Sequence, residues 1–343
     1  MIKKTILITG GAGFIGSNFV RNICVRTDVK KEFDFFIIDS LTYAGNYFSI
    51  EDVVNKNKNL SFEQIDLRHS ERVMSFLKSL NFCGVIHFAA ESHVDRSISG
   101  PDIFVETNVL GTINLLKVSL EKFKTNPQFL YLQISTDEVY GSLGANDPAF
   151  TERHVLKPNS PYSSSKASAD LFVRSYYKTY GLPVLITRCS NNYGPYQHPE
   201  KLIPLMIENA KSDKKLPVYG KGENVRDWIY VDDHNDAVWE VFTKGKIGEV
   251  YNIGGESEQV NLDVVKMIIK KLGKNESLIN YVTDRLGHDL RYAMDITKIK
   301  KELGWRPKKT FEAGLDQTID WYIKNSMWSK KVLERANYTN STN

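Results

Sequence analysis

The 343-residue sequence has few cysteines and no long run of apolar residues or of like charge. Its three cysteines, Cys24, Cys83 and Cys189, are odd in number and far apart, so they fit neither a disulfide framework nor a metal site. The chain runs from Lys3 and Lys4 directly into a strand pattern without a signal-peptide region, and no stretch approaches about 18 apolar residues. These absences favour a reduced cytoplasm and argue against secretion, a membrane partner and a bound metal.

The charge balance also excludes some partners. With 45 basic and 41 acidic residues the net charge is only +4, so the sequence does not indicate a nucleic-acid partner, although an anionic small substrate is compatible. A composition of 41% hydrophobic and 25% charged residues is that of an ordinary soluble globular protein. The chain is long enough for two lobes that share one cleft.

Glycines recur every three residues near the N-terminus, directly after a short apolar strand pattern at 5–9. The residues expected at this turn and at the start of the following helix are Gly10, Gly13, Phe14, Ile15 and Gly16. Small residues are needed there because the backbone must turn tightly and approach a pyrophosphate, which the amides at the helix N-terminus stabilise. A second strand at 35–38 ends in Asp39, which can bind an adenosine ribose and would repel a 2′-phosphate. Together these features predict bound NAD.

The strand patterns at 60–65 and 85–88 continue the alternation of strands and helices. Residues expected beside the cofactor at the ends of these two strands are Asp66, Leu67, Ala89 and Ala90. His93 follows, and a lone histidine is more often structural than catalytic, so both interpretations stay open. Asn108, in a helix expected to open at 107–111, is a candidate for organising the site through hydrogen bonds.

The segment STDEVYG at 135–141 follows the apolar strand pattern 129–134. In an open α/β sheet the carboxyl ends of the strands border the ligand crevice, so a hydroxyl and two adjacent carboxylates there face whatever is bound. The residues concerned are Ser135, Thr136, Asp137 and Glu138. The alternative for an isolated acidic pair is a solvated turn.

A helix is expected from Pro161 through Tyr177, with Tyr162 and Lys166 four residues apart on one face. An ammonium near a phenol favours the phenolate, which would make the tyrosine a usable base near neutral pH. The alternative is a surface pair at ordinary helical spacing.

After residue 188 the simple alternation breaks. We expect short strands at 216–220, 226–233 and 251–254, the second of them re-entering the first lobe, and a helix capped by Asn261 that runs to 272. Four basic residues, Lys201, Arg226, Arg285 and Arg291, either converge on a diphosphate or are scattered solvated charges. The predicted domains are an NAD-binding domain at 1–188 with return segments at 227–256 and 311–325, a substrate-binding domain at 189–226 and 257–310, and a polar, frayed tail at 326–343.

These motifs resemble those of the extended short-chain dehydrogenases/reductases, and within that group those of the dTDP-glucose 4,6-dehydratase family. The resemblance extends to about Trp305 and rests on LTYAGN at 41–46, AAESHVDRSI at 89–98, STDEVYG, PYSSSKAS at 161–168, CSNNYGPYQHPEKLIP at 189–204, RDWIYVDDH at 226–234 and RLGHDLRYAMD at 285–295. Leu286 stands where that family usually has proline, which puts the local loop shape in question. The related 4-epimerases lack the pair Asp137 and Glu138, which therefore indicates elimination.

The resemblance implies a Rossmann-type, doubly wound parallel sheet with a smaller, discontinuous α/β substrate-binding domain, tightly bound NAD and a homodimer. It implies oxidation of dTDP-glucose at C4, loss of water across C5 and C6, and return of hydride to C6, as in the supply of deoxysugars such as rhamnose. Implied catalytic residues are Thr136, Asp137, Glu138, Tyr162 and Lys166, with Ser92, Asn108, Ser135, Tyr162 and Lys166 also on the cofactor. Implied substrate contacts are Ser92, His93, Thr136, Asn191, Lys201, Leu202, Pro217, Tyr219, Arg226, Asn261, Arg285, His288 and Tyr292.

Three alternatives remain. The same elimination could act on UDP-glucose or CDP-glucose, because selection of the base depends on pocket shape. An NAD-dependent 4-epimerase would carry out oxidation without elimination. A catalytically silent NAD-binding regulatory protein is a third reading, which any turnover excludes.

Overall fold

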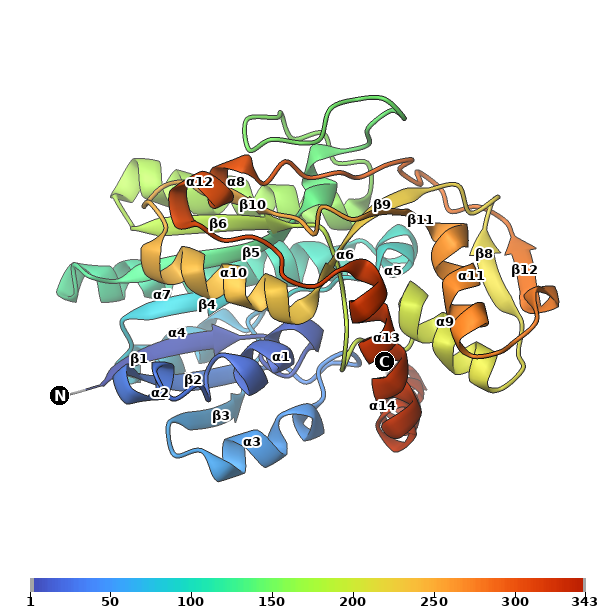
Figure 1. Ribbon diagram of the computed structural model, residues 1–343. Helices are drawn as coiled ribbons and strands as arrows, with labels where there is room; N and C mark the ends of the chain where they lie inside the picture. Colours follow the sequence, from blue (N-terminus) through green and yellow to red (C-terminus); the bar gives the residue numbers. More distant parts are fainter. Residues whose placement is uncertain (1–2, 342–343) are drawn as a thin grey trace.

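The computed structural model describes residues 3–341, and its larger lobe is built on one parallel sheet (Figure 1). The seven strands lie in the order β10-β6-β5-β4-β1-β2-β3, and every neighbouring pair is parallel. Their bounds are β1 Lys4–Thr9, β2 Phe33–Asp39, β3 Leu60–Gln64, β4 Gly84–His87, β5 Leu130–Thr136, β6 Val184–Cys189 and β10 Val250–Ile253. This order confirms the predicted Rossmann-type, doubly wound sheet.

Helices cover both faces of this sheet. Successive side chains of β1 point to opposite faces, so Ile6 packs in one hydrophobic cluster with Phe19 and Trp239, and Leu7 packs in another with Leu115. The helices of this lobe are α1 Phe14–Asn22, α2 Val29–Glu32, α3 Glu51–Lys56, α4 Ser70–Ser79, α5 Val94–Ser99, α6 Asp102–Phe104, α7 Gly111–Thr125, α8 Pro161–Tyr180, α10 Val231–Lys244 and α12 Thr297–Leu303, with short turns η1 Tyr47–Ser49 and η3 Asp137–Tyr140. The carboxyl ends of the strands therefore open between two packed layers.

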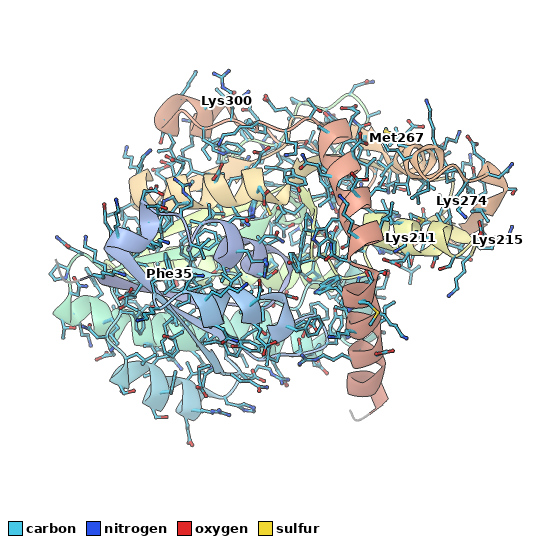
Figure 2. All side chains as sticks on the ribbon, turned by 60° about the horizontal axis from the view of Figure 1, so that its bottom comes forward. Phe35, Lys211, Lys215, Met267, Lys274 and Lys300 are labelled. Carbon is cyan, nitrogen blue, oxygen red and sulfur yellow. The ribbon has the colours of Figure 1, made fainter. Side chains whose placement is uncertain are left out.

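The smaller lobe lies on the right of Figure 1, beyond the carboxyl ends of the sheet. It contains a three-stranded sheet, β11-β9-β7, a two-stranded sheet, β12-β8, and helices that pack on them. Its elements are β7 Asn191–Tyr193, α9 Leu202–Lys211, β8 Leu216–Tyr219, β9 Val225–Tyr230, β11 Glu258–Val260, α11 Asn261–Lys271, η4 Glu276–Leu278 and β12 Ile279–Val282. In Figure 2, Phe35 lies in the large lobe, whereas Lys211, Lys215 and Lys274 lie at the opposite side, in the small lobe.

One predicted strand was placed wrongly. The segment 226–233 does not re-enter the large sheet as a strand, because β9 ends at Tyr230 and pairs with β7 and β11. Buried Asp227 fixes this arrangement, since its carboxylate accepts hydrogen bonds from the amides of Gly255 at 3.1 Å and Ser257 at 2.7 Å. The chain returns to the large lobe through α10 and β10 instead.

The expected frayed tail at 326–343 is wrong for residues 326–341, which form helix α14 Ser326–Ser341, while residues 342–343 lie outside the described residues. Trp328, Val332 and Ala336 recur every four residues and form an apolar stripe, of which Val332 is fully buried. Trp328 Nε1 donates a hydrogen bond to Ser49 Oγ at 3.0 Å. The preceding helix, α13 Phe311–Lys324, places Phe311 and other apolar residues in the small lobe's hydrophobic cluster. The domain boundaries otherwise stay a prediction.

The segment 102–125 forms one continuous helix, in which a π-helical turn, η2 Val105–Leu110, joins α6 to α7. It begins five residues before the predicted start at 107. By length and mean hydropathy alone this helix could cross a membrane, although polar residues such as Glu106, Asn108 and Lys117 interrupt it, so it is not a continuous apolar stretch of about 18 residues. More than half of its most apolar window is buried inside the protein, where α7 packs against α4 and α8. This packing is typical of a core helix.

Candidate active site

The glycine turn packs tightly against the chain's own backbone, so side chains are excluded at two of its positions. Gly10 has φ +70°, and a Cβ there would lie 2.5 Å from the amide nitrogen of Ala89. A Cβ on Gly16 would clash with the carbonyl of Gly10. Gly13 is the N-cap of α1 and provides no side-chain cap, so the first amides of this helix point into the pocket without a capping oxygen. The turn is thus built for close approach of an anion to backbone N–H groups.

Asp39 ends β2 at the wall of the same pocket. Its carboxylate accepts hydrogen bonds from the amides of Ala12 at 3.0 Å and Leu41 at 2.8 Å, and burial raises its pKa. Asp66 and Leu67 line a small recess that also contains Asp39. Burial alone would raise the pKa of Asp66, but paired hydrogen bonds from Arg68 bring it below its usual value. The structure therefore brings together the residues predicted for an adenosine end.

Most of the other predicted cofactor residues line the larger pocket, which Gly10 and Asp39 also border. They are Phe14, Ile15, Ala89, Ala90, Ser92, Ser135, Tyr162 and Lys166. Asn108 is the exception, since it lines none of the pockets around the sheet's carboxyl ends. Its side chain accepts from the amide of Glu91 at 2.8 Å and donates to the Glu91 carbonyl at 3.0 Å and to Ser165 Oγ at 2.9 Å. It lies in the π-helical turn, and its hydrogen bonds join this turn to the loop after β4 and to α8. Asn108 thus organises the site, as predicted, without lining it.

The STDEVYG segment places four polar residues where β5 ends. Thr136 is its last strand residue, and Asp137 begins the 3₁₀ turn η3. Thr136 Oγ1 accepts from the Glu138 amide at 3.4 Å, which caps this turn, and lies 3.3 Å from Asp137 Oδ1. Glu138 lines both the dinucleotide pocket and a second pocket between the lobes, whereas Asp137 lines only the first. Glu138 therefore lies at the junction of the two pockets.

The two adjacent carboxyl groups have different electrostatic surroundings. Burial raises the pKa of Asp137 well above its usual range, and the neighbouring carboxylates of Glu138 and Asp227 raise it further. Burial also raises the pKa of Glu138, but Arg226, Lys201 and Arg285 oppose this effect by attracting the charged form. Within the pair, the proton is therefore held more strongly by Asp137 than by Glu138.

Helix α8 presents Tyr162 and Lys166 to the dinucleotide pocket from its first two turns. A capping box between Ser160 and Ser163, with Pro161 at the first position, fixes the start of this helix. Lys166 Nζ donates a hydrogen bond to the carbonyl of Ile134 at 2.8 Å, and burial lowers its pKa.

The phenol does not have the acidity that the spacing predicts. Burial raises the pKa of Tyr162 well above its usual value, and the charges of Glu138, Cys189 and Asp137 add to this rise. A hydrogen bond from Thr136 acts in the opposite direction. The effect expected from Lys166 alone is therefore outweighed in the protein without ligands, because a buried phenolate would lie next to two carboxyl groups.

The second pocket lies between the lobes and collects the predicted substrate residues except Thr136, which lines the dinucleotide pocket instead. Its lining includes Ser92, His93, Asn191, Lys201, Leu202, Pro217, Tyr219, Arg226, Asn261, Arg285, His288 and Tyr292. Three of the four basic residues thus converge, whereas Arg291 does not. Arg291 instead pairs with Glu258, with Nε 2.6 Å from Oε2, and bonds the Asp147 carbonyl outside this pocket. For Arg291 the alternative of a charge outside the site holds, because Glu258 on β11 and the Asp147 carbonyl are its partners.

Arg226 and Tyr292 form one wall of this pocket. Arg226 Nη2 donates to the Asp289 carbonyl at 2.9 Å, and its guanidinium lies 4.3 Å from the centre of the Tyr292 ring. Tyr292 Oη donates to Asp289 Oδ2 at 2.5 Å. Both side chains are almost fully buried, so the positive charge is held in place before any ligand arrives.

The two predicted histidines are neutral residues of this wall. Burial and, to a smaller extent, the charge of Lys201 lower the pKa of His93 to about 4, so its contact with Glu200 at 3.7 Å is not an ion pair near neutral pH. Burial also lowers the pKa of His288, whose Nδ1 lies 2.7 Å from Asp284 Oδ1. Leu286, beside them, is 76% exposed and lines neither pocket.

Asn261 lines the pocket, but it does not cap α11 as predicted. The cap position is Val260, and Asn261 is the first residue of the helix. Its buried Oδ1 atom has no hydrogen-bond partner among the residues that the structure describes, and the same holds for Asn191 Oδ1. Unpartnered buried oxygens that border a pocket are suited to bind donors of a ligand.

Sequence reasoning assigned no role to Glu200 or Tyr43. Glu200 lines both pockets and accepts a hydrogen bond from Tyr43 Oη at 3.0 Å. Beside it, Lys201 Nζ donates to the Ser92 carbonyl at 2.8 Å, a second link between the lobes. Both residues lie in motifs quoted above, so the only available signal was a carboxylate next to a candidate binding lysine.

Fold and site together define a Rossmann-type enzyme with a dinucleotide pocket, a cationic pocket between its lobes and a carboxyl pair where they meet. A family model described as GDP-mannose 4,6 dehydratase matches residues 7–318. The dTDP-glucose 4,6-dehydratase of Escherichia coli is 49% identical over 354 residues, covering 96% of each chain. This chain belongs to the dTDP-glucose 4,6-dehydratase family.

Solved structures agree with this assignment. The dTDP-glucose 4,6-dehydratase of Streptomyces venezuelae, solved with NAD and dTDP bound, superposes with a TM-score of 0.89 at 45% identity and covers 96% of this chain and 99% of its own. The UDP-glucose 4-epimerase of Thermus thermophilus, solved with NAD, has a TM-score of 0.83 at only 26% identity, covering 94% and 99%. The epimerases thus share the fold, while sequence identity favours the dehydratases.

Proposed function

We propose that this protein converts dTDP-glucose to dTDP-4-dehydro-6-deoxy-glucose and water. The observation that carries this proposal is the pair Asp137 and Glu138 at the junction of the two pockets, in which Asp137 holds the proton more strongly than Glu138. An elimination needs one group that takes a proton and another that gives one. An epimerase needs no such pair.

The dinucleotide pocket fits NAD. Gly10 and Gly16 allow the tight turn that brings the start of α1 to the pocket, and the uncapped start of this helix suits a pyrophosphate. Asp39 would hold the ribose hydroxyls and disfavour a 2′-phosphate. Bound NAD supplies a hydride acceptor for C4 and, later, a hydride donor for C6. Because the cofactor ends each cycle as it began, we expect it to stay bound.

Tyr162 acts as the base for the C4 hydroxyl. The phenol would lose its proton most easily with the positively charged nicotinamide ring of NAD nearby, because this positive charge opposes the carboxylates that raise the pKa of Tyr162. Lys166, held by the Ile134 carbonyl, keeps a second positive charge on the same helical face. Thr136 lies between the phenol and the carboxyl pair and hydrogen-bonds near the C4 oxygen.

The carboxyl pair then removes water. Oxidation at C4 makes the C5 proton acidic, and ionised Glu138 accepts it. Protonated Asp137 gives its proton to the departing C6 hydroxyl, which leaves as water. When hydride adds to C6, Glu138 would return a proton to C5, and the proton that Tyr162 took from the C4 hydroxyl would replace the one that Asp137 lost.

The pocket between the lobes holds the nucleotide. Lys201, Arg226 and Arg285 supply three positive charges for the diphosphate. Donors and acceptors for the remainder of the substrate come from Asn191, Asn261, Tyr292, Ser92, His93, Tyr219 and His288, with Leu202 and Pro217 as apolar contacts.

Parallel assays with dTDP-glucose, UDP-glucose and CDP-glucose test this function. We expect loss of one water from dTDP-glucose at the highest kcat/KM, measured by mass spectrometry of the sugar nucleotide. Faster loss of water from UDP-glucose or CDP-glucose would show that the enzyme prefers uracil or cytosine, and not thymine, as the nucleobase of its substrate. A product of unchanged mass with inverted C4 would instead support an epimerase.

We further propose a cytoplasmic homodimer without a membrane partner. Apolar side chains are exposed on neighbouring helices of the large lobe, among them Val105 and Leu110 on η2 and Leu171 and Phe172 on α8. Leu171 is 56% exposed. Such a patch is suited to cover the same patch on a second copy.

A further inference from the structure

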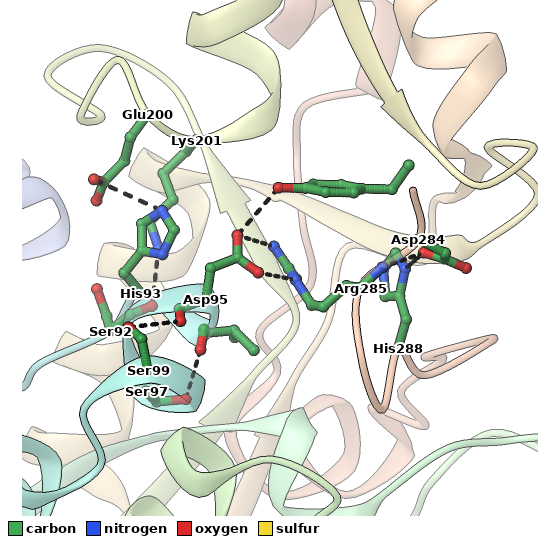
Figure 3. A network of polar contacts seen from close by, with 12 residues as sticks. Ser92, His93, Asp95, Ser97, Ser99, Glu200, Lys201, Asp284, Arg285 and His288 are labelled. Carbon is green, nitrogen blue, oxygen red and sulfur yellow. Dashed lines mark hydrogen bonds and ion pairs between the residues drawn. The ribbon is translucent and has the colours of Figure 1, made fainter. Parts of the chain in front are cut away.

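One ion pair joins the two lobes within the wall of the cationic pocket (Figure 3). Arg285 Nε donates to Asp95 Oδ1 at 2.5 Å, and Arg285 Nη2 donates to Asp95 Oδ2 at 2.9 Å. Asp95 lies in the first turn of α5 in the large lobe, whereas Arg285 follows β12 in the small lobe. Both residues line the pocket, so this contact is part of the candidate substrate site.

The geometry of this pair leaves part of the guanidinium available. Asp95 occupies the edge formed by Nε and Nη2. A planar guanidinium has a second edge, which carries Nη1 and can pair with another anion at the same time. Arg285 can therefore keep its carboxylate partner while it binds a phosphate oxygen.

Other contacts hold the pair in this orientation. Tyr219 Oη donates to Asp95 Oδ2 at 3.3 Å, and the Arg285 guanidinium carbon lies 5.2 Å from the centre of the Tyr219 ring. On the loop itself, Asp284 Oδ1 accepts from the Arg285 amide at 2.8 Å. The Arg285 side chain is only 22% exposed, so few other orientations are open to it.

We propose that Asp95 is a positioning residue for the nucleotide diphosphate: it holds Arg285 with its second edge available and ties the small-lobe loop to the large lobe. The proposal deepens the function proposed above and rests on it for the identity of the ligand. Ordering a free arginine side chain on binding costs conformational entropy, and Asp95 removes much of this cost from the binding step. If Asp95 merely competed with the phosphate for Arg285, it would instead weaken binding of the nucleotide diphosphate.

The test compares wild type with Asp95→Asn for binding of dTDP by calorimetry and for turnover of dTDP-glucose. We expect the Kd of dTDP and the KM of dTDP-glucose each to rise about tenfold, the size typical for loss of a charge-assisted pair, with kcat changed less than about twofold. Asp95→Glu, which keeps the charge, should recover part of the affinity. In an Arg285→Lys background, Asp95→Asn should have much less effect, because the oriented group is already gone.

Asp320→Asn on α13 is a matched control, since it also removes one exposed helical carboxylate but lies outside the pocket. It should leave Kd and KM unchanged, and unfolding temperatures of all variants identify any loss of fold. Equal or tighter dTDP binding by Asp95→Asn would overturn the proposal, as would full additivity with Arg285→Lys. Wild-type protein that binds dTDP but does not dehydrate dTDP-glucose would instead overturn the proposed function, while the binding comparison would still test Asp95.

Discussion

At the scale of single residues, the difference between Asp137 and Glu138 determines what the site can do. They are neighbours in sequence, but only Glu138 has three cations, Arg226, Lys201 and Arg285, that oppose its burial. Asp137 is surrounded by two further carboxylates. These different surroundings are the basis for the proposed division of the pair into an acid and a base.

Glu138→Gln should separate the two halves of the reaction. The amide cannot accept the C5 proton, so overall turnover should fall by at least about 10²-fold, the usual contribution of a general base. The first oxidation should survive, and the absorbance of reduced cofactor after substrate addition measures it. Glu71→Gln, an exposed position on α4, is the control. Full turnover by Glu138→Gln would remove Glu138 from the mechanism.

Asp137→Asn should change how stability depends on pH. Since the folded state raises the pKa of Asp137, it binds this proton more tightly than the unfolded chain does. The contribution of the Asp137 carboxyl group to the free energy of unfolding is fully present below a pH of about 4, and it is lost as the pH rises through the raised pKa of the folded state. Asparagine does not ionise, so Asp137→Asn keeps its stability as the pH rises. Its unfolding temperature should therefore exceed that of wild type by a margin that grows with pH. A margin independent of pH would contradict the raised pKa.

The sequence predicted residue identities better than residue partners. Thr136, Tyr162 and Lys166 could be placed by a strand end and a helical spacing, and they line one pocket. The pKa of Tyr162 could not be predicted from the sequence, because it depends on carboxyl groups that only the fold brings near the phenol. The partner of Arg285 is 190 residues away in sequence, beyond any local pattern.

At the scale of elements, the C-terminal helix α14 supports the cofactor pocket from outside. Arg335 Nη2 donates to the Leu41 carbonyl at 2.8 Å, and the Leu41 amide in turn donates to Asp39 Oδ1. Leu41 has φ +55°, a conformation that costs energy for a branched side chain and must be held by its surroundings. Helix α14 is therefore linked through Leu41 to Asp39, the residue proposed to bind the ribose.

Arg335→Ala should weaken retention of NAD. Loss of one hydrogen bond from a charged donor corresponds to about 1.5–3 kcal/mol at most, so we expect about a tenfold faster loss of cofactor. NAD remaining after extensive dialysis, measured in denatured samples, provides the readout. Lys330→Ala, exposed on the same helix, should retain as much NAD as wild type. Equal retention by Arg335→Ala would show that α14 does not support the pocket.

Elements with a strong local pattern were predictable, and those decided by distant contacts were not. Strand β1 and helix α8 follow from an apolar run and from Pro161 with its serine cap. Strand β9 has the same kind of pattern, yet Asp227 fixes it in a different sheet. Helix α14 has a short apolar stripe, but its partner Ser49 lies near the other end of the chain.

At the scale of the whole molecule, the second pocket lies where the two lobes meet, and several polar contacts join one lobe to the other. Tyr43 with Glu200, Ser92 with Lys201, and Asp95 with Arg285 each join one lobe to the other. The doubly wound sheet was predictable because strands and helices alternate along the first 188 residues. The small lobe was less so, since its two sheets pair strands that are distant in sequence.

Leu171→Glu should dissociate the proposed homodimer. The charge would lie in the apolar surface shared by η2 and α8, where burial against a second copy disfavours it. Sedimentation velocity should give a dimer for wild type and a monomer for the variant. Tyr281→Glu, an exposed apolar position on β12 in the small lobe, should remain dimeric. A wild-type monomer, or a dimeric Leu171→Glu, would place the interface elsewhere or exclude it.

Elimination is tested most directly by mass spectrometry of the sugar nucleotide formed from dTDP-glucose in deuterated water with only catalytic NAD. We expect a product that has lost one water and gained one carbon-bound solvent deuterium, at C5, because Glu138 exchanges its proton with solvent while the hydride from C4 returns internally to C6. A dehydrated product without deuterium would contradict proton removal at C5 by a solvent-exchanging carboxylate. An unchanged substrate would contradict the proposed activity itself.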